Sequence, residues 1–194
     1  SEIAGALIRG VQSKHVGTSL KHFLANNQET RRMSVNEIID ERTLNEIYLA
    51  AFEGAVKKAK PWTVMCSYNR INGTYAAAHH KYLTETLRDK WGFDGYVMSD
   101  WGAVNDRVED LKAGLDLEIP FPLPEKNKLI VEAVQNGTLE EKVLDTAVER
   151  ILNIVYRYAE NRDTKAVFDL DHDHEAAKKV AEETIVLLKN ENVL

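Results

Sequence analysis

Four short apolar runs, separated by segments with helical periodicity, are the feature that most restricts the fold of this chain. The runs cover residues 16–22, 62–68, 96–100 and 114–119. Apolar runs that do not alternate with polar residues are typical of parallel strands with both faces covered. The pattern therefore predicts an α/β fold in which parallel strands are surrounded by outer helices.

Segments with apolar residues at every third or fourth position predict the helices. The longest early helix, residues 41–60, follows Asp40, whose side chain can cap it, and ends at Pro61. The dipeptide Asn72-Gly73 predicts a turn, and an apolar run at residues 184–189 predicts a last strand without an evident partner. Further helices are predicted over residues 2–11, 82–91, 105–113, 126–135, 139–158 and 175–183.

The chain length bounds how much of a barrel these units can form. Four strand-and-helix units make half of a (β/α)8 barrel of the TIM type, and 194 residues fall short of the roughly 250 of a complete one. We therefore expect a partial barrel over residues 1–159 and a charged linker over residues 160–174. A partial barrel exposes a sheet edge and apolar surface, which predicts self-association.

Composition excludes several classes of partner. A net charge of −6 argues against binding to nucleic acid or an anionic membrane, because both require clustered positive charge. No apolar stretch reaches the 18 or so residues of a membrane span, and no secretory signal pattern is visible at the N-terminus. The single cysteine, Cys66, allows no internal disulfide. A small neutral ligand and a cytoplasmic location are the resulting expectations.

Three of the four predicted strands end in polar residues. The first ends in Lys21-His22, the second in Ser67-Tyr68-Asn69 and the third in Ser99-Asp100. Active sites of α/β barrels are built at the carboxyl ends of the strands, so these residues mark a candidate site. Asp100 is the leading candidate, because a carboxylate there can attack carbon, assist proton transfer or bind a cation, and Trp101 beside it offers an apolar face.

Other interpretations of these residues stay open from the sequence alone. Asp100 can instead cap the helix predicted near Asn105, and His22 can be a structural histidine. If Asp100 binds a metal, Asp116 and Glu118 are the additional candidate ligands. The acidic and histidine-rich stretch 169–174 lacks a defined ligand spacing and is interpreted as solvated linker. No glycine-rich phosphate loop is present, and we expect neither a cofactor nor a metal.

Several motifs together resemble glycoside hydrolase family 3, in particular its β-glucosidases. They occur in the family's order and span nearly the whole chain. They cover residues 21–29 (KHFLANNQE), 40–44 (DERTL), 65–69 (MCSYN), 99–103 (SDWGA), 113–120 (AGLDLEIP) and 185–191 (IVLLKNE).

The resemblance implies a role for seven residues. Asp100, in the family's Ser-Asp-Trp motif, corresponds to the nucleophile, and Trp101 is implied to line the sugar subsite. The pair Lys21 and His22 is implied to bind sugar hydroxyls, as is Arg32. Met65 and Tyr68 correspond to residues that pack beside the reacting centre.

The resemblance also implies a retaining mechanism that needs a second carboxylate. In similar β-glucosidases that group is a Glu of a second α/β domain, into which residues 175–194 are expected to lead. The chain is therefore expected to supply the nucleophile half of a β-glucosidase that acts on β-glucosides or short β-linked glucans, with little activity alone. The alternative is a non-catalytic half-barrel that binds sugar or serves as a scaffold.

Overall fold

The computed structural model describes residues 1–120 and 124–192. These residues fall into two compact units, Ser1–Arg162 and Asp163–Leu194, which are described separately. Among the described residues, no helix combines the length and apolar character needed to cross a membrane.

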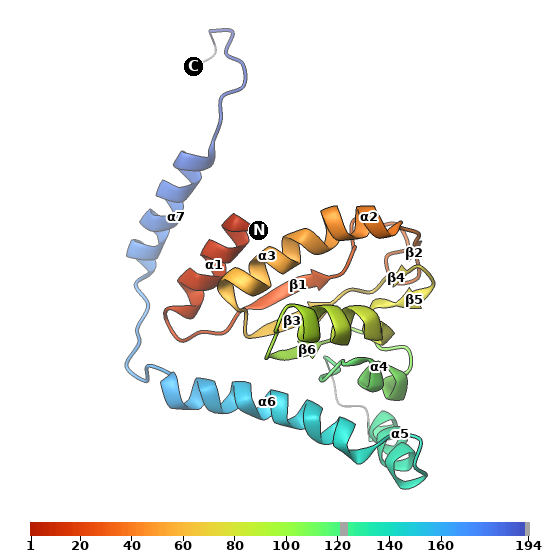
Figure 1. Ribbon diagram of the computed structural model, residues 1–194. Helices are drawn as coiled ribbons and strands as arrows, with labels where there is room; N and C mark the ends of the chain where they lie inside the picture. The colour runs from red at the N-terminus through yellow and green to blue at the C-terminus, as the bar shows by residue number, and fades with distance from the viewer. Residues whose placement is uncertain (121–123, 193–194) are drawn as a thin grey trace. The chain divides into compact units, whose positions relative to one another are not determined.

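A three-stranded parallel sheet forms the centre of the first unit (Figure 1). Its strands are β1 (Ser19–Phe23), β3 (Thr63–Cys66) and β6 (Tyr96–Met98), in the order β1-β3-β6. Val64 of β3 lies beside Leu20 on one side and Val97 on the other. This arrangement confirms the prediction of parallel strands from three of the four apolar runs.

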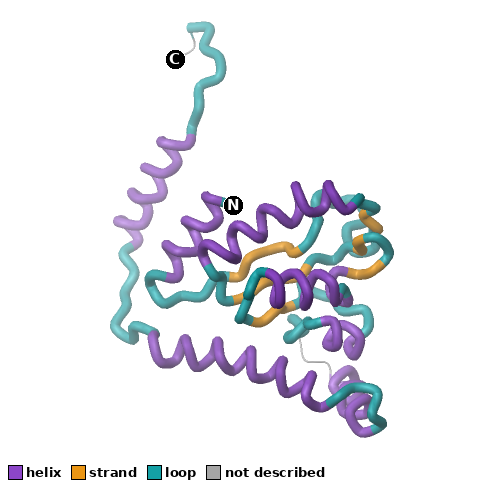
Figure 2. The backbone as a smooth tube through the Cα atoms, viewed as in Figure 1, coloured by secondary structure: helices purple, strands orange, loops and turns teal. Residues whose placement is uncertain are grey.

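Helices alternate with these strands along the chain (Figure 2). The side chain of Asp40 accepts a hydrogen bond from the backbone N–H of Thr43 at 3.0 Å and so caps the long helical segment, as predicted. The helical elements of the first unit are α1 (Glu2–Gln12), α2 (Glu41–Thr43), the π-helical η1 (Leu44–Leu49), α3 (Ala50–Ala59), the 3-10 turn η2 (Ala76–Ala78), the π-helical η3 (Lys81–Lys90), α4 (Arg107–Ala113), α5 (Pro124–Gln135) and α6 (Glu141–Asn161).

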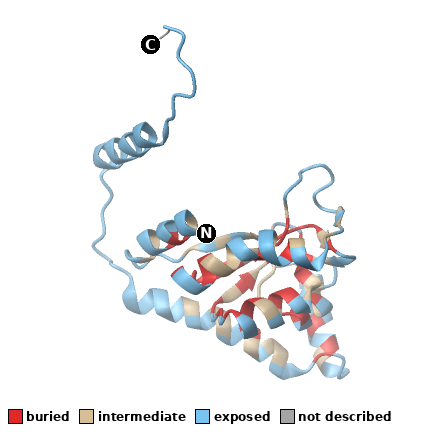
Figure 3. Ribbon diagram, turned by 45° about the horizontal axis from the view of Figure 1, so that its top comes forward, coloured by how far each residue is buried: buried red, intermediate tan, exposed pale blue. Residues whose placement is uncertain are grey.

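The main core of the unit joins these helices to the sheet. Phe23 of β1 meets Phe52 of α3 edge to face, with ring centroids 5.1 Å apart, and meets Trp91, which follows η3, at 6.0 Å. Val64 and Val97 in the centre of the sheet are fully buried. The buried residues of the main core form one cluster, and Figure 3 shows buried stretches on the strands and on the helices beside them. Burial on both faces explains why these strands are apolar runs in the sequence.

A second, smaller sheet, whose strands alternate along the chain with those of the first, contains the predicted turn. It consists of β2 (Asn36–Glu37), β4 (Arg70–Ile71) and β5 (Thr74–Tyr75), of which β4 and β5 are antiparallel. The connecting residues Asn72 and Gly73 have φ angles of 49° and 99°. Two successive positive φ angles are what a tight hairpin turn requires, and Asn-Gly provides them at low cost.

The prediction of a fourth strand over residues 114–119 is wrong, because these residues do not form a regular strand. Only Leu117 bridges to β6, opposite Met98. The backbone N–H groups of Asp116 and Leu117 both donate to the Val97 carbonyl, while the Asp116 side chain accepts from Val97 N–H at 2.7 Å. A side chain thus takes the place of a backbone partner, so the segment follows β6 without a regular ladder.

The predicted ends of the linker also differ from the structure. The helix α6 continues to Asn161, and α7 (Leu170–Thr184) begins earlier than the predicted Glu175. Asp169 is the cause, because its side chain accepts a hydrogen bond from the N–H of His172 and caps α7. The stretch interpreted as solvated linker therefore contains the beginning of a helix.

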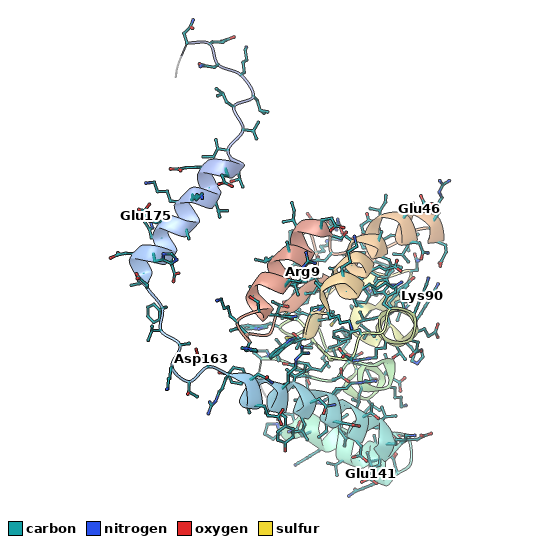
Figure 4. All side chains as sticks on the ribbon, turned by 60° about the vertical axis from the view of Figure 1, so that its left-hand side comes forward. Arg9, Glu46, Lys90, Glu141, Asp163 and Glu175 are labelled. Carbon is teal, nitrogen blue, oxygen red and sulfur yellow. The ribbon has the colours of Figure 1, made fainter. Side chains whose placement is uncertain are left out.

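In the second unit, α7 is an exposed helix followed by an irregular segment. Its side chains, including those around Glu175, extend into solvent (Figure 4). Residues 185–192 form no strand, contrary to the prediction for residues 184–189. A strand requires a partner for its backbone groups, and within the described part of the chain residues 184–189 join no sheet.

Candidate active site

The carboxyl ends of the three parallel strands bring together polar residues from three separate parts of the chain. His22 lies in β1, Tyr68 follows β3 by two residues, and Asp100 follows β6 by two residues. Because neighbouring parallel strands run in the same direction, their carboxyl ends share one edge of the sheet (Figure 1).

Asp100 is the centre of this group. The hydroxyl of Tyr68 donates a hydrogen bond to Asp100 Oδ1 at 3.0 Å, and the backbone N–H of Trp101 donates to the same oxygen at 2.7 Å. The Nε2 atom of His22 lies 3.5 Å from Asp100 Oδ2. These contacts hold the carboxylate in place. Because 14% of the Asp100 side chain is exposed, it can still be reached from solvent.

The surroundings of Tyr68 and His22 shift the pKa values of both side chains. Burial raises the pKa of Tyr68, and its hydrogen bond to Asp100 raises this pKa further, so the phenol keeps its proton. Burial lowers the pKa of His22 and the charge of Lys21 adds to the effect, while Asp100 opposes it. The lowered pKa favours a neutral imidazole, which donates one hydrogen bond and accepts another.

Arg32 extends the group through Tyr68. Its guanidinium carbon lies 5.3 Å from the centre of the Tyr68 ring, and its Nη1 pairs with Glu29 at 2.7 Å. The Glu29 contact is the main cause of the raised pKa of Arg32, to which the charge of Asp100 contributes less. Arg32 thus lies close to the site but is paired with Glu29.

The other three predicted residues have fewer ties to Asp100. Lys21 is exposed and acts on His22 by its charge. Met65 is half-buried on β3, in register with Met98 of β6. Trp101 joins the site through its backbone N–H, while its residue is 63% exposed, so the indole face is open to solvent. Direct sugar contacts of these three residues remain predictions.

The helix-cap interpretation of Asp100 is wrong. Asp106 caps α4 instead, because its Oδ1 accepts hydrogen bonds from the N–H groups of Val108 and Glu109, each at 3.1 Å. Asp100 is therefore not needed to begin that helix. Its carboxylate serves the contacts with Tyr68, Trp101 and His22.

The additional metal ligands considered from the sequence are occupied by ion pairs. The buried carboxylate of Asp116 pairs with Arg88 and, at 2.9 Å, with Arg150. Glu118 pairs with Arg107 and Lys126. Within residues 1–120 and 124–192, no group of three or more acidic, histidine or cysteine side chains is arranged to hold a metal ion.

Sequence reasoning recognised Ser67, Asn69 and Ser99 as polar strand-end residues but assigned them no role. All three are almost completely buried. The Nδ2 atom of Asn69 donates a hydrogen bond to the Leu24 carbonyl at 3.2 Å, which ties the residues after β3 to those after β1. These three residues are direct sequence neighbours of Tyr68 or Asp100, and only the structure shows that they are buried.

Comparison with known proteins identifies relatives of the whole chain. Residues 1–154 match the N-terminal domain of glycosyl hydrolase family 3. Thermostable beta-glucosidase B of Acetivibrio thermocellus is 56% identical over 192 residues, which are 99% of this chain and 25% of that protein. An exo-alpha-(1->6)-L-arabinopyranosidase of Bifidobacterium longum is 51% identical over 97% of this chain and 25% of its own length.

Solved structures show the same fold. A family 3 beta-glucosidase of Bifidobacterium adolescentis, 48% identical, superposes with a TM-score of 0.91 over 97% of this chain and 28% of its own. Beta-glucosidase 3B of Thermotoga neapolitana in complex with alpha-D-glucose, 43% identical, gives 0.92 over 100% of this chain and 28% of its own. The chain thus spans about a quarter of its relatives' length and forms part of their α/β barrel domain.

Proposed function

Because the chain belongs to glycosyl hydrolase family 3, we propose that it supplies the nucleophile of a retaining β-glucosidase, with Asp100 in that role. The observation that carries this proposal is the carboxylate of Asp100 at the carboxyl end of β6, held by Tyr68 and His22. Two donors on one oxygen and a histidine beside the other orient the carboxylate for attack in a single direction.

The proposed reaction follows the two steps of retaining glycosidases. An oxygen of Asp100 forms a bond to the anomeric carbon while the bond to the departing oxygen breaks and a general acid protonates that oxygen. Water, activated by the same acid/base group, then attacks the anomeric carbon and releases both the sugar and the Asp100 carboxylate. The acid/base group belongs to a part of the complete enzyme outside these residues.

The surrounding residues suit a polyhydroxyl ligand. Lys21 and His22 offer donors to ring hydroxyls, Arg32 adds charge beside Tyr68, and Met65 packs near the reacting centre. The exposed indole of Trp101 offers an apolar face of the kind that stacks on a sugar ring. A β-glucoside or a short β-linked glucan is the proposed substrate.

An α-L-arabinopyranoside is the second candidate substrate, because the relative at 51% identity is named for cleavage of that sugar. The two assignments differ in the sugar but share the nucleophile. Parallel kcat/KM measurements on the nitrophenyl β-glucoside and α-L-arabinopyranoside decide between them. A preference for the arabinopyranoside contradicts the glucosidase assignment and leaves Asp100 in its role.

Replacement of Asp100 by Ala in the complete protein tests the role itself. We expect the turnover of nitrophenyl β-glucoside to fall by at least about 10⁴-fold, because covalent attack is lost together with charge stabilisation. Asp94→Ala, an exposed carboxylate two residues before β6, is the matched control and should keep normal turnover. Near-normal turnover of Asp100→Ala contradicts the assignment and favours a sugar-binding or scaffold role.

A further inference from the structure

Two buried serines stand directly before the two residues that meet at the centre of the site. Ser67 precedes Tyr68, and Ser99 precedes Asp100. Their residues are 1% and 0% exposed, so their hydroxyls make their hydrogen bonds inside the protein. Neither serine touches Asp100 through an interaction described above, and the proposed chemistry uses neither.

The Ser67 hydroxyl holds the residue that follows β1. It accepts a hydrogen bond from the backbone N–H of Leu24 at 2.9 Å and donates one to the Leu24 carbonyl at 2.8 Å. The Ser67 N–H also donates to the Phe23 carbonyl at 2.7 Å. A hydroxyl can donate and accept at once, so this side chain extends the pairing of β1 with β3 beyond the strands themselves.

The Ser99 hydroxyl makes similar contacts with Ile119, in the segment beside the end of β6. It accepts a hydrogen bond from the Ile119 N–H at 3.0 Å and lies 3.5 Å from the Ile119 carbonyl. The Ser99 N–H donates to the Leu117 carbonyl at 2.9 Å. The Gly102 N–H, two residues past Asp100, points at the same Ile119 carbonyl at 3.5 Å. Ser99, before Asp100, and Gly102, after it, thus both contact Ile119.

Ser67 therefore ties the end of β3 to that of β1, and Ser99 ties the end of β6 to the irregular segment 117–119. The contact between Tyr68 and Asp100 joins the ends of β3 and β6, and the contact between His22 and Asp100 joins those of β1 and β6. Both depend on strand ends that the regular ladders no longer hold, since β3 ends at Cys66 and β6 at Met98.

We infer that Ser67 and Ser99 are positioning residues, which hold the Asp100 carboxylate in line for attack by fixing the ends of β3 and β6 to the segments beside them. The inference rests on the proposed function. Small displacements of a reacting group cost large factors in rate, so loss of either hydroxyl should slow the attack more than it weakens substrate binding.

The test measures the attack step in the complete protein. The wild type and the variants Ser67→Ala and Ser99→Ala are mixed with a 2-deoxy-2-fluoro-β-glucoside that carries a dinitrophenyl leaving group, and intact mass follows adduct formation. Such a leaving group departs without a general acid, so the rate reports on Asp100. Ser67→Cys and Ser99→Cys, which keep the size of the side chain but hydrogen-bond weakly, serve if an alanine variant does not fold.

Thr63→Val is the matched control. Thr63 is also buried on β3, and its hydroxyl also donates a hydrogen bond to a backbone carbonyl, that of Thr18, at 3.3 Å. Unlike the serines, Thr63 lies at the amino end of its strand. A general loss of stability should therefore affect this variant as well. Circular dichroism at the assay temperature confirms that each variant is folded.

We expect adduct formation in the serine variants to slow by about 10- to 100-fold, with the apparent dissociation constant of the glucoside changed less than about threefold. The Thr63→Val rate should stay within about twofold of wild type. Serine variants as fast as Thr63→Val overturn the positioning role and leave the proposed function intact. A wild type that turns over glucosides without an adduct on Asp100 overturns both.

Discussion

At the scale of single residues, Asp110 is a carboxylate without an adequate partner. Its residue in α4 is 1% exposed, and among the described residues neither side-chain oxygen has a hydrogen-bond partner. Burial raises its pKa from 3.8 to about 7, and the charges of Asp106 and Glu118 add to the shift. The folded protein therefore holds a proton that the unfolded chain releases near pH 4.

This difference predicts how stability depends on pH. Between about pH 4 and pH 7 the folded state binds more protons at Asp110 than the unfolded state, so the free energy of unfolding falls as the pH rises. Asp110→Asn removes the titration. We expect its stability relative to wild type to be higher at pH 8 than at pH 4 by roughly 2–4 kcal/mol, measured by chemical denaturation. An equal difference at both pH values contradicts the prediction.

The sequence alone predicts that the central residues lie together, whereas it does not predict the contacts that support them. Asp100, Tyr68 and His22 stand at the ends of apolar runs, and the parallel pattern was enough to predict that they meet. The roles of Ser67 and Ser99 depend on which backbone groups of Leu24 and Ile119 they face. Such contacts join residues 43 and 20 positions apart, and no local pattern encodes them.

At the scale of elements, β6 requires a glycine at its entry. A Cβ atom on Gly95 would overlap the backbone carbonyl of Trp62, at the entry to β3, which has no room to move aside. We expect Gly95→Ala to lower the free energy of unfolding by about 1–3 kcal/mol, measured by chemical denaturation, because the ends of two paired strands are forced apart.

Gly10→Ala is the control for this substitution. Gly10 lies in α1, and a Cβ there meets nothing within 4 Å. Alanine favours the helix over glycine by roughly 0.5–1 kcal/mol, so this variant should be as stable as wild type or slightly more stable. Equal losses in the two variants argue against the close approach of β3 and β6 as the cause.

Helices were easier to predict from the sequence than strands. Periodicity and the Asp40 cap predict a helix over residues 41–60, and the structure has helical elements over residues 41–59, because a helix satisfies its backbone groups locally. The predicted strands 114–119 and 184–189 failed because a strand depends on its neighbour. The first is paired irregularly through the Asp116 side chain, and the second has no partner among the described residues.

At the scale of the whole molecule, the chain contributes part of a barrel. Its parallel strands and outer helices match about a quarter of the length of family 3 enzymes, and β1 pairs with one strand only among the described residues. Self-association through this open edge stays a prediction. Under the proposed function, catalysis belongs to the complete enzyme, and this chain supplies the nucleophile and the residues around it.

The site of covalent attachment tests this account most directly. The complete protein is incubated with the 2-deoxy-2-fluoro-β-glucoside, digested and sequenced by mass spectrometry. We predict one fluorinated hexosyl group on the peptide that contains Asp100, attached to that carboxylate and absent from Asp100→Ala. A stable adduct on any other carboxylate, or turnover of β-glucosides with no adduct at all, contradicts the account.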